Sequence, residues 1–218
     1  MLTAKGIHKY YGDLHVLKGV DVIIQPGEIV SIVGASGAGK STLLHIMGTL
    51  DQADEGTIAV GENVLSSMSG DKLADFRNLE LGFIFQFHNL LPEFTAEENI
   101  MIPGLIAGKP EKDLRKRVKE LATLLGIDGR LDHKPSELSG GEQQRVAVAR
   151  ALINSPKIIF ADEPSGNLDS ASAQSLHELF FKLRDEFGQS FVIVTHNQEL
   201  ARMADRMLTM QDGVIVSD

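Results

Sequence analysis

Residues 34–41 read GASGAGKS, and this glycine-rich run constrains the fold more than any other part of the chain. The preceding residues 28–33 (EIVSIV) are a short apolar run typical of a buried strand, and residues 41–50 (STLLHIMGTL) are predicted to be a helix. The run matches the pattern G-x-x-x-x-G-K-[ST], in which a loop opens a helix and its backbone amides surround phosphate groups. The order strand, loop, helix therefore predicts a phosphate-binding α/β domain.

Each part of this loop has a predicted role in holding phosphates. Its three glycines allow the backbone to approach a phosphate closely, and the amides of residues 37–42 would form an anion-binding nest at the helix N-terminus. Lys40 would reach the β- and γ-phosphates of a nucleoside triphosphate, and the Ser41 hydroxyl would ligate Mg²⁺. The predicted nucleotide-binding residues of the loop are Gly34, Ala35, Ser36, Gly37, Ala38, Gly39, Lys40, Ser41 and Thr42.

Two carboxylates follow a second apolar run. Residues 158–163 read IIFADE, and catalytic groups of an open α/β sheet are expected where its strands end. Asp162 is expected to hold Mg²⁺, often through water, and Glu163 to polarise the attacking water. An Asp-Glu pair after a strand is commonly plain surface charge, but the phosphate loop upstream favours the catalytic interpretation.

Strands and helices alternate along much of the chain. Residues 81–85 (LGFIF) and 191–194 (FVIV) also have the pattern of buried strands, and a helix before the second run ends at Gly188. The apolar stripe of that helix comprises Leu176, Leu179, Phe180, Leu183 and Phe187. This alternation predicts a parallel sheet covered by helices on both faces.

Residues 90–150 interrupt the alternation with helical patterns. Thr95 and Glu98 have the spacing of a capping box, which starts a helix. A later apolar stripe at helical spacing ends at Gly126, a residue typical of helix ends. The members of this stripe are Leu114, Val118, Leu121 and Leu125. We therefore expect an inserted α-helical subdomain.

Composition and charge exclude several other classes of protein. The chain has 218 residues and a formal net charge of −9, which disfavours broad nucleic-acid binding. It contains no cysteine, so disulfides and thiolate metal sites are excluded. No run approaches the roughly 18 apolar residues of a membrane-spanning helix, and the N-terminus, MLTAKGIHKYYGD, lacks the apolar region of a signal peptide. A membrane role would therefore depend on a partner protein.

A second candidate anion site follows the helical stretch. Residues 138–143 read LSGGEQ and continue as QRVAVARAL, so Ser139 and the two glycines after it open a helix with free amides. Ser139 and Glu142 also have capping-box spacing, and both interpretations can hold together. The segment LSGGEQQRVAVARAL resembles the signature of ABC (ATP-binding cassette) ATPases, which distinguishes them from other P-loop NTPases.

Further motifs in the same order extend this resemblance over nearly the whole chain. In KYYG, Tyr11 matches the aromatic residue that stacks on adenine, with Tyr10 as the competing candidate. Gln86 matches the Q-loop glutamine, which contacts the metal and the water. Asp169 ends SGNLD, which matches the D-loop, and His196 in VIVTHN matches the switch histidine near the γ-phosphate.

The resemblance implies an ABC ATPase fold: an α/β P-loop NTPase core with a mixed, largely parallel sheet, an N-terminal antiparallel β region and an inserted α-helical subdomain. The chain is expected to form a single ABC ATPase domain over residues 1–218. Residues 1–89 and 151–218 would form the core with the N-terminal β region, and residues 90–150 the helical signature subdomain.

The resemblance also implies a head-to-tail homodimer with ATP between the phosphate loop of one subunit and the signature helix of the other. The implied catalytic residues are Glu163, His196, Gln86 and Lys40. The implied nucleotide-binding residues outside the loop are Tyr11, Ser139, Gly140, Gly141 and Asp169, of which Ser139 and Asp169 would act across the interface. The implied Mg²⁺ ligands are Ser41, Gln86 and Asp162.

A transporter motor is favoured over an ABC ATPase of DNA repair or translation, because the segment between Gln86 and Ser139 is too short for a long coiled coil. The LSGGEQ segment also disfavours a P-loop kinase or GTPase. The segment FIFQFHNLLPEFTAEENIMIP resembles the ATPases of lipoprotein-releasing (Lol) systems. Their relatives, the macrolide-exporter and cell-division ATPases, remain alternatives. Ser165 is a mild departure, since many members have Thr there.

An ABC motor of this kind requires integral membrane subunits. Leu90, Leu91 and Phe94 cluster beside Pro92 in loop-like sequence, and apolar side chains on a loop are unfavourable in water unless a partner covers them. We expect Gln86–Phe94 to dock these subunits; the alternative is that the three apolar side chains fill the core of the helical subdomain. The chain would lie at the cytoplasmic face of the bacterial inner membrane.

Overall fold

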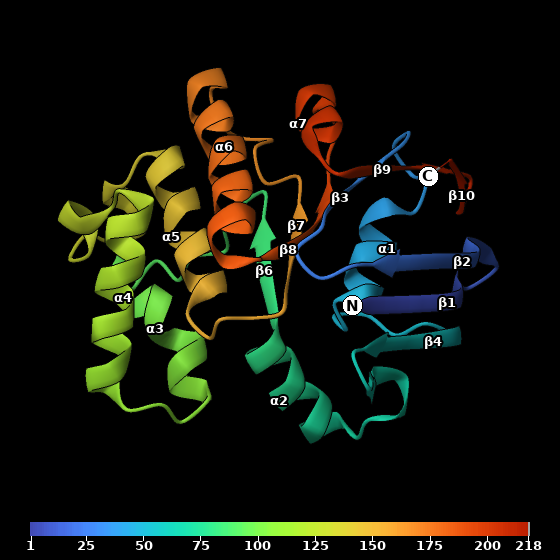
Figure 1. The fold of residues 1–218 in the computed structure, drawn as a ribbon, viewed down its shortest axis with the longest axis horizontal. Helices are drawn as coiled ribbons and strands as arrows, with labels where there is room; N and C mark the ends of the chain where they lie inside the picture. Colours follow the sequence, from blue (N-terminus) through green and yellow to red (C-terminus); the bar gives the residue numbers. More distant parts are fainter. Residues whose placement is uncertain (218) are drawn as a thin grey trace.

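Residues 1–217, the part that this computed structural model describes, fold around two β-sheets (Figure 1). The larger sheet has six strands in the order β10-β9-β3-β8-β7-β6, and the smaller has four in the order β2-β1-β4-β5. The larger sheet comprises β3 (Ile29–Val33), β6 (Leu81–Phe85), β7 (Ile158–Asp162), β8 (Ser190–Val194), β9 (Arg206–Gln211) and β10 (Val214–Ser217). The smaller comprises β1 (Leu2–Tyr11), β2 (Leu14–Ile24), β4 (Glu55–Val60) and β5 (Asn63–Val64).

Parallel pairing dominates the larger sheet. Strand β3 pairs in parallel with β8 and β9, and β7 pairs in parallel with β6 and β8, whereas β10 is antiparallel to β9. Strands β3 and β8 are buried along their whole length, which explains their continuous apolar sequence. In the smaller sheet, β1 pairs antiparallel with β2 and β4. The predicted mixed sheet and N-terminal antiparallel region are therefore confirmed.

Each face of the larger sheet carries its own hydrophobic core, because alternate side chains of a strand point to opposite faces. In β7, Ile159 and Ala161 join a core formed with the helices. Ile158 and Phe160 join a second core formed with the smaller sheet and helix α1 (Lys40–Met47). Strand β7, which leads to the two predicted site carboxylates, is thus packed on both faces.

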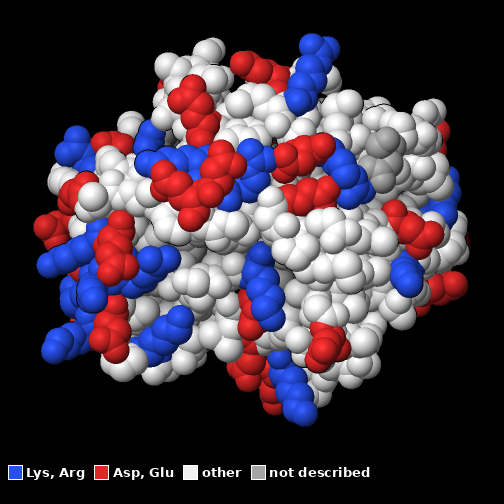
Figure 2. Space-filling view, in the orientation of Figure 1, with Lys and Arg blue, Asp and Glu red and all other residues white. Residues whose placement is uncertain are grey.

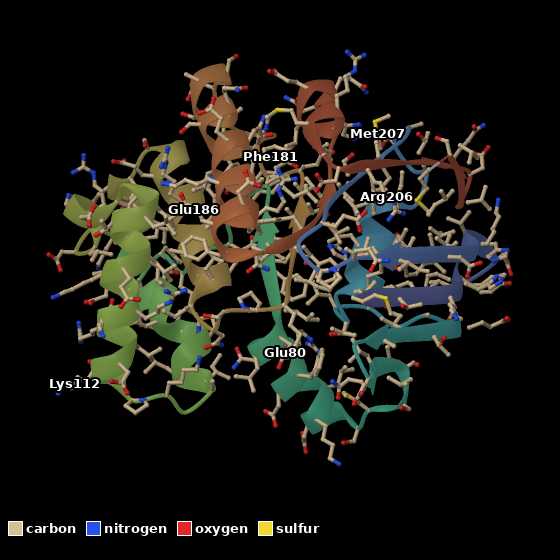
Figure 3. The ribbon with its side chains drawn as sticks, in the orientation of Figure 1. Glu80, Lys112, Phe181, Glu186, Arg206 and Met207 are labelled. Carbon is tan, nitrogen blue, oxygen red and sulfur yellow. The ribbon has the colours of Figure 1, made fainter. Side chains whose placement is uncertain are left out.

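Arg206 of β9 links the two sheets (Figure 3). Its guanidinium donates a hydrogen bond to the Ile23 carbonyl oxygen near the end of β2, at 3.0 Å. It also pairs with Glu28, just before β3, at 2.9 Å. This contact holds the edge of the smaller sheet against the start of the central strand.

Helices α3 (Ala96–Ile106), α4 (Glu111–Leu125) and α5 (Gly140–Leu152) pack on one another beside the larger sheet (Figure 1). On the same side, α6 (Ser170–Phe187) packs next to α5. The chain also contains α2 (Gly70–Glu80), α7 (Gln198–Met203) and short 3₁₀ turns at Leu65–Ser67, Asp128–Arg130 and Pro135–Glu137. The division into a core and a helical subdomain at residues 90 and 150 stays a prediction.

The predicted helix ends are found where glycine or a capping residue stands. Thr95 and Glu98 form the capping box that starts α3. Gly126 and Gly188 end α4 and α6, each in the left-handed conformation with φ 66°. These local signals depend only on neighbouring residues, so the sequence is sufficient to place them.

The end of α1 was predicted wrongly. The pattern of residues 41–50 suggests a helix through Leu50, but α1 ends at Met47. Gly48 is its C-cap, and its amide donates to the Leu44 carbonyl oxygen at 2.9 Å. Thr49 then turns the chain with φ 61°, so the apolar pattern continues past the helix.

Charged side chains are spread over the surface of the molecule. Figure 2 shows acidic and basic side chains interspersed on the face that it draws, with several Lys and Arg over α4. Among the helices of residues 1–217, none combines the length and apolar character needed to cross a membrane.

The two-sided core makes a testable prediction. Phe160 has no exposed surface, and its ring lies 5.7 Å from that of Phe83. Phe160→Ala is expected to lower the free energy of unfolding by about 3–5 kcal/mol, because it leaves a cavity against the sheet. Phe187→Ala is the control, since Phe187 is 59% exposed. Urea denaturation followed by circular dichroism measures both, and equal losses would contradict this account of the core.

Candidate active site

The loop between β3 and α1 presents free backbone amides. Gly39, with φ 99°, precedes α1, and neither a side-chain cap nor an acidic residue occupies the first turn. A Cβ at Gly34 would lie only 2.1 Å from the Met210 carbonyl oxygen of β9, so the loop is packed tightly against the sheet. The start of α1 therefore offers uncapped amides and the positive end of a helix dipole to an anion.

Lys40 folds back over this loop. Its ammonium donates to the carbonyl oxygens of Gly34 and Ala35, both at 2.9 Å, and the residue is 6% exposed. The other predicted loop residues surround it: Ser36, Gly37 and Ala38 lie in the loop, and Thr42 lies in the first turn of α1. The structure thus gathers the whole predicted set at one helix N-terminus.

The predicted metal ligands meet where β6 and β7 end. The Ser41 hydroxyl donates to Oδ1 of Asp162 at 3.1 Å. Phe85 is the register partner of Asp162, so Gln86 follows directly across from that carboxylate. His45 is an additional neighbour that the sequence analysis missed, with Nε2 at 3.6 Å from Oδ2 of Asp162. Its position four residues after Ser41, one turn along α1, was the available signal.

Glu163 and His196 also lie together. The backbone amide of His196 donates to Oε2 of Glu163 at 3.1 Å. The imidazole Nε2 lies 3.3 Å from Oε1 without hydrogen-bond geometry, so this buried oxygen accepts no hydrogen bond. Glu163 has φ 48°, an uncommon conformation for a residue with a side chain. The carboxylate is thus fixed by the backbone and retains one unused acceptor.

Gln86 binds the segment that follows Glu163. Its Nε2 donates to Oδ1 of Asn167 at 3.0 Å, and Nδ2 of Asn167 donates to the Gln86 carbonyl oxygen at 3.1 Å. Asn167 lies inside the SGNLD motif, but the sequence analysis gave it no role. A Cβ at Gly166 would lie 2.9 Å from Nε2 of Gln86, so any larger residue there would displace the Gln86 side chain.

The signature segment lies apart from the phosphate loop within one chain. Ser139 caps α5, and its hydroxyl and the Glu142 carboxylate form the predicted capping box. Helix α5 belongs to the core on one face of the larger sheet and α1 to the core on the other (Figure 1). Asp169 likewise caps α6, accepting hydrogen bonds from the amides of Ala171 and Ser172. Ser139 and Asp169 therefore start helices that pack on the face of the sheet opposite α1.

The two candidate aromatic residues have different surroundings. The Tyr10 ring stacks on His15 at a centroid distance of 4.0 Å, so one of its faces is covered. Tyr11 is 51% exposed, and its hydroxyl donates to Oδ2 of Asp51 at 2.6 Å. Lys9 donates to Oδ1 of the same Asp51 at 2.9 Å. A fixed, exposed ring favours Tyr11 as the base-stacking residue, and this assignment stays a prediction.

The expected docking segment needs one correction. Leu91 and Phe94 are exposed, at 42% and 41%, in agreement with the expectation. Leu90 instead packs against the core of the helical side, because the chain turns inward at this position. Phe87 is 75% exposed and was missed, although it stands next to Gln86 in the sequence.

Hydrogen bonding lowers the pKa of Glu142. The Ser139 amide donates to its carboxylate at 2.8 Å, and the Arg130 guanidinium pairs with it at 2.6 Å. Together they lower the pKa of Glu142 from 4.5 to about 2. The ionised carboxylate therefore stabilises the start of α5 above pH 4.5, and this contribution is lost as the pH falls toward 2.

We predict that Glu142→Gln lowers the free energy of unfolding at pH 7 by about 1 kcal/mol, because the helix start loses a charged cap. The difference from wild type should shrink as the pH falls from 4.5 toward 2. Denaturant titrations at stepped pH measure this, with Glu186→Gln on the exposed surface of α6 as the control. A difference that stays constant down to low pH would contradict the assigned cause.

The fold and this set of motifs define a class of protein. A model of the ABC transporter family matches residues 17–166, and the chain belongs to this family. It is an ATP-hydrolysing subunit of the ABC type.

Particular relatives match over the full length. The chain is 58% identical to the lipoprotein-releasing system ATP-binding protein LolD of Cytophaga hutchinsonii, over 99% of both chains. It is equally similar, at 58%, to the LolD protein of Bacteroides thetaiotaomicron over 100% of both. Its fold is similar to that of the dimeric ABC transporter cassette MJ0796, with a TM-score of 0.91, 39% identity and coverage of 100% and 97% of the two chains.

These findings confirm the predicted ABC ATPase fold, the ATP-hydrolysing activity and the resemblance to lipoprotein-releasing ATPases. MJ0796 has also been solved in a post-hydrolysis state bound to ADP and Pi, with a TM-score of 0.91 and 38% identity. The roles of individual residues stay predictions.

Proposed function

We propose that this chain is the motor subunit of a transporter that uses ATP to release lipoproteins from the bacterial inner membrane. The observation that carries the proposal is identity of 58% to proteins named LolD over essentially the full length of both chains. Similarity of this extent covers helices α3–α6 as well as the phosphate loop. The chain would lie at the cytoplasmic face of the membrane, held there by integral membrane subunits.

The chemistry assigned to the site is hydrolysis of the γ-phosphate by water. Lys40 exchanges its two carbonyl partners for phosphate oxygens, and the uncapped amides of α1 bind the remaining phosphate charge. Glu163 accepts a proton from the attacking water through its unused oxygen Oε1. His196, with its side chain 61% exposed beside Glu163, is placed to contact the γ-phosphate.

Residues near Asp162 suit Mg²⁺ as the metal of the nucleotide. The Ser41 hydroxyl and the Asp162 carboxylate are hard oxygen donors held 3.1 Å apart, and Gln86 adds an amide oxygen from the adjoining strand end. The ion, when bound, would neutralise phosphate charge that develops during hydrolysis.

We further propose a head-to-tail homodimer. Within one chain the signature helix and the phosphate loop lie on opposite sides of the sheet, so each site would use Ser139–Gly141 of a second copy. A two-fold axis would then create two equivalent composite sites. The dimeric state of the similar cassette MJ0796 supports this arrangement.

The catalytic assignment predicts the behaviour of Glu163→Gln. An amide of equal size should preserve ATP binding but cannot accept the proton, so hydrolysis should fall by about 10²–10⁴-fold. The variant should also accumulate as an ATP-bound dimer, which size exclusion chromatography detects. Near-normal phosphate release would show that another residue activates the water.

The membrane subunits are proposed to dock beside Gln86. A groove of about 410 Å³ lies between α2, β6, α3 and α5, with Phe85, Asn89 and Ile106 among its lining residues. Phe87, which is 75% exposed, lies in the same loop. Such a concave apolar surface suits a helix of a partner protein.

Phe94→Glu tests the docking segment Gln86–Phe94, of which Asn89 lines this groove. The variant should fold, bind ATP and keep basal hydrolysis as an isolated subunit, but it should fail to co-purify with the membrane subunits. Phe187→Glu places the same charge on α6, distant in sequence from the docking segment, and should co-purify normally. If Phe94→Glu unfolds or loses ATP binding, the side chain belongs to the core and the subunits dock elsewhere.

The cargo is tested with the assembled complex in lipid vesicles. ATP should release a lipid-anchored protein from vesicles that contain wild-type motor subunits, and Glu163→Gln subunits should release none. Stimulated hydrolysis without release of any lipid-anchored protein would contradict the proposed cargo while leaving the motor role intact.

A further inference from the structure

A buried hydrogen-bond chain, His88–Gln144–Pro164, connects the turn after Gln86 with the segment after Glu163. His88 lies in the loop between β6 and α3 and is 7% exposed, and Gln144 lies on α5 with no exposed surface. The imidazole Nδ1 contacts Oε1 of Gln144. Nε2 of Gln144 then donates to the Pro164 carbonyl oxygen at 2.7 Å.

The donor and the acceptor of each bond in this hydrogen-bond chain are fixed. A carbonyl oxygen only accepts, so the amide nitrogen of Gln144 must face Pro164. The amide oxygen consequently faces His88, and Nδ1 of the imidazole must carry the proton. If His88 or Pro164 shifts, a buried polar group loses its partner, at a cost of about 1–3 kcal/mol. A displacement of His88 is therefore either opposed by Gln144 or passed through Gln144 to Pro164.

Residues at both ends of this hydrogen-bond chain have uncommon backbone conformations. His88 and Asn89 have φ values of 61° and 50°, and Glu163 has φ 48°. Such residues persist only where surrounding contacts hold them. The Arg150 guanidinium donates to the carbonyl oxygens of His88 and Asn89, each at 2.6 Å. Gln144 supports the other end through the residue that follows Glu163.

The outer side of this turn belongs to the docking groove. Asn89 and Arg150 line the groove, while His88 lies beneath them in the interior. A partner segment seated in the groove would therefore touch residues bonded directly to His88. The side chain of Gln86, by contrast, donates to Asn167 and does not take part in this hydrogen-bond chain.

We propose that His88 and Gln144 are positioning residues that transmit occupancy of the docking groove to Glu163. The inference rests on the proposed function, because it requires a partner in that groove. Contact with Asn89 and Arg150 shifts the turn, Gln144 follows His88, and the Pro164 carbonyl carries the displacement to the neighbouring catalytic carboxylate. Hydrolysis thereby becomes faster when the membrane subunits are engaged.

The test compares kcat and KM for ATP in the isolated chain and in its complex with the membrane subunits in lipid nanodiscs. Gln144→Met keeps the size of the side chain and removes both hydrogen bonds. His88→Ala removes the donor, whereas His88→Asn places an amide N–H near the position of Nδ1 and tolerates a positive φ. We expect the first two variants to lose about tenfold or more of the stimulation in kcat, with KM within about twofold of wild type. His88→Asn should recover most of it.

His177→Ala is the matched control. His177 is 1% exposed on α6, and its Nε2 lies 3.0 Å from Oγ of Ser165, so it holds the neighbouring residue without contacting the turn at His88. This variant should lose thermal stability, measured by its melting temperature, but keep the stimulation.

Three results would overturn the inference: normal stimulation of His88→Ala, failure of His88→Asn to recover it, or an equal loss in His177→Ala. A wild-type chain that no membrane subunit binds or stimulates would overturn the proposed function and this inference together. A stimulated wild type with an equally stimulated His88→Ala would overturn the inference alone.

Discussion

Burial of the parallel strands on both faces is the constraint on which the rest of the structure depends. Strand β7 is packed by the helical core on one face and by α1 and the smaller sheet on the other. Its end therefore has little freedom, and Asp162 and Glu163 leave it in fixed directions. The Ser41 hydroxyl reaches Asp162 because α1 packs on the same sheet. The site is thus assembled by elements that pack in the core.

Much of this arrangement could be predicted from local sequence. The phosphate loop, the strand at 158–162 and the capping box at Ser139 depend on neighbouring residues, so their patterns are sufficient. The end of α1 is hidden because the apolar pattern continues past Gly48, and the inward turn of Leu90 depends on residues distant in sequence. A short apolar pattern does not distinguish a helix from the turn that follows it, or an exposed leucine from one covered by another helix.

The missed site residues share a physical cause. Asn167 pairs with Gln86, 81 positions away, and His45 lies against Asp162, 117 positions away. Asp51, which holds the Tyr11 hydroxyl, is 40 positions from Tyr11. Polar residues of these types are common on surfaces, and only the folded geometry gives them a partner. For Glu163, the sequence shows its place after a strand. It does not show that one of its carboxylate oxygens is buried without a hydrogen-bond partner.

The contacts of Lys40 have a consequence for how this loop selects its ligand. Because its ammonium is already bonded to two loop carbonyls, nucleotide binding in the proposed way would replace one set of hydrogen bonds by another. The affinity is therefore a difference between two satisfied states, and a weakly charged ligand gains little from the exchange. A polyphosphate, which brings several charged oxygens, would compensate the loss with charge-assisted bonds. A ligand would therefore be favoured according to the charge and the number of acceptor oxygens that it brings to the loop.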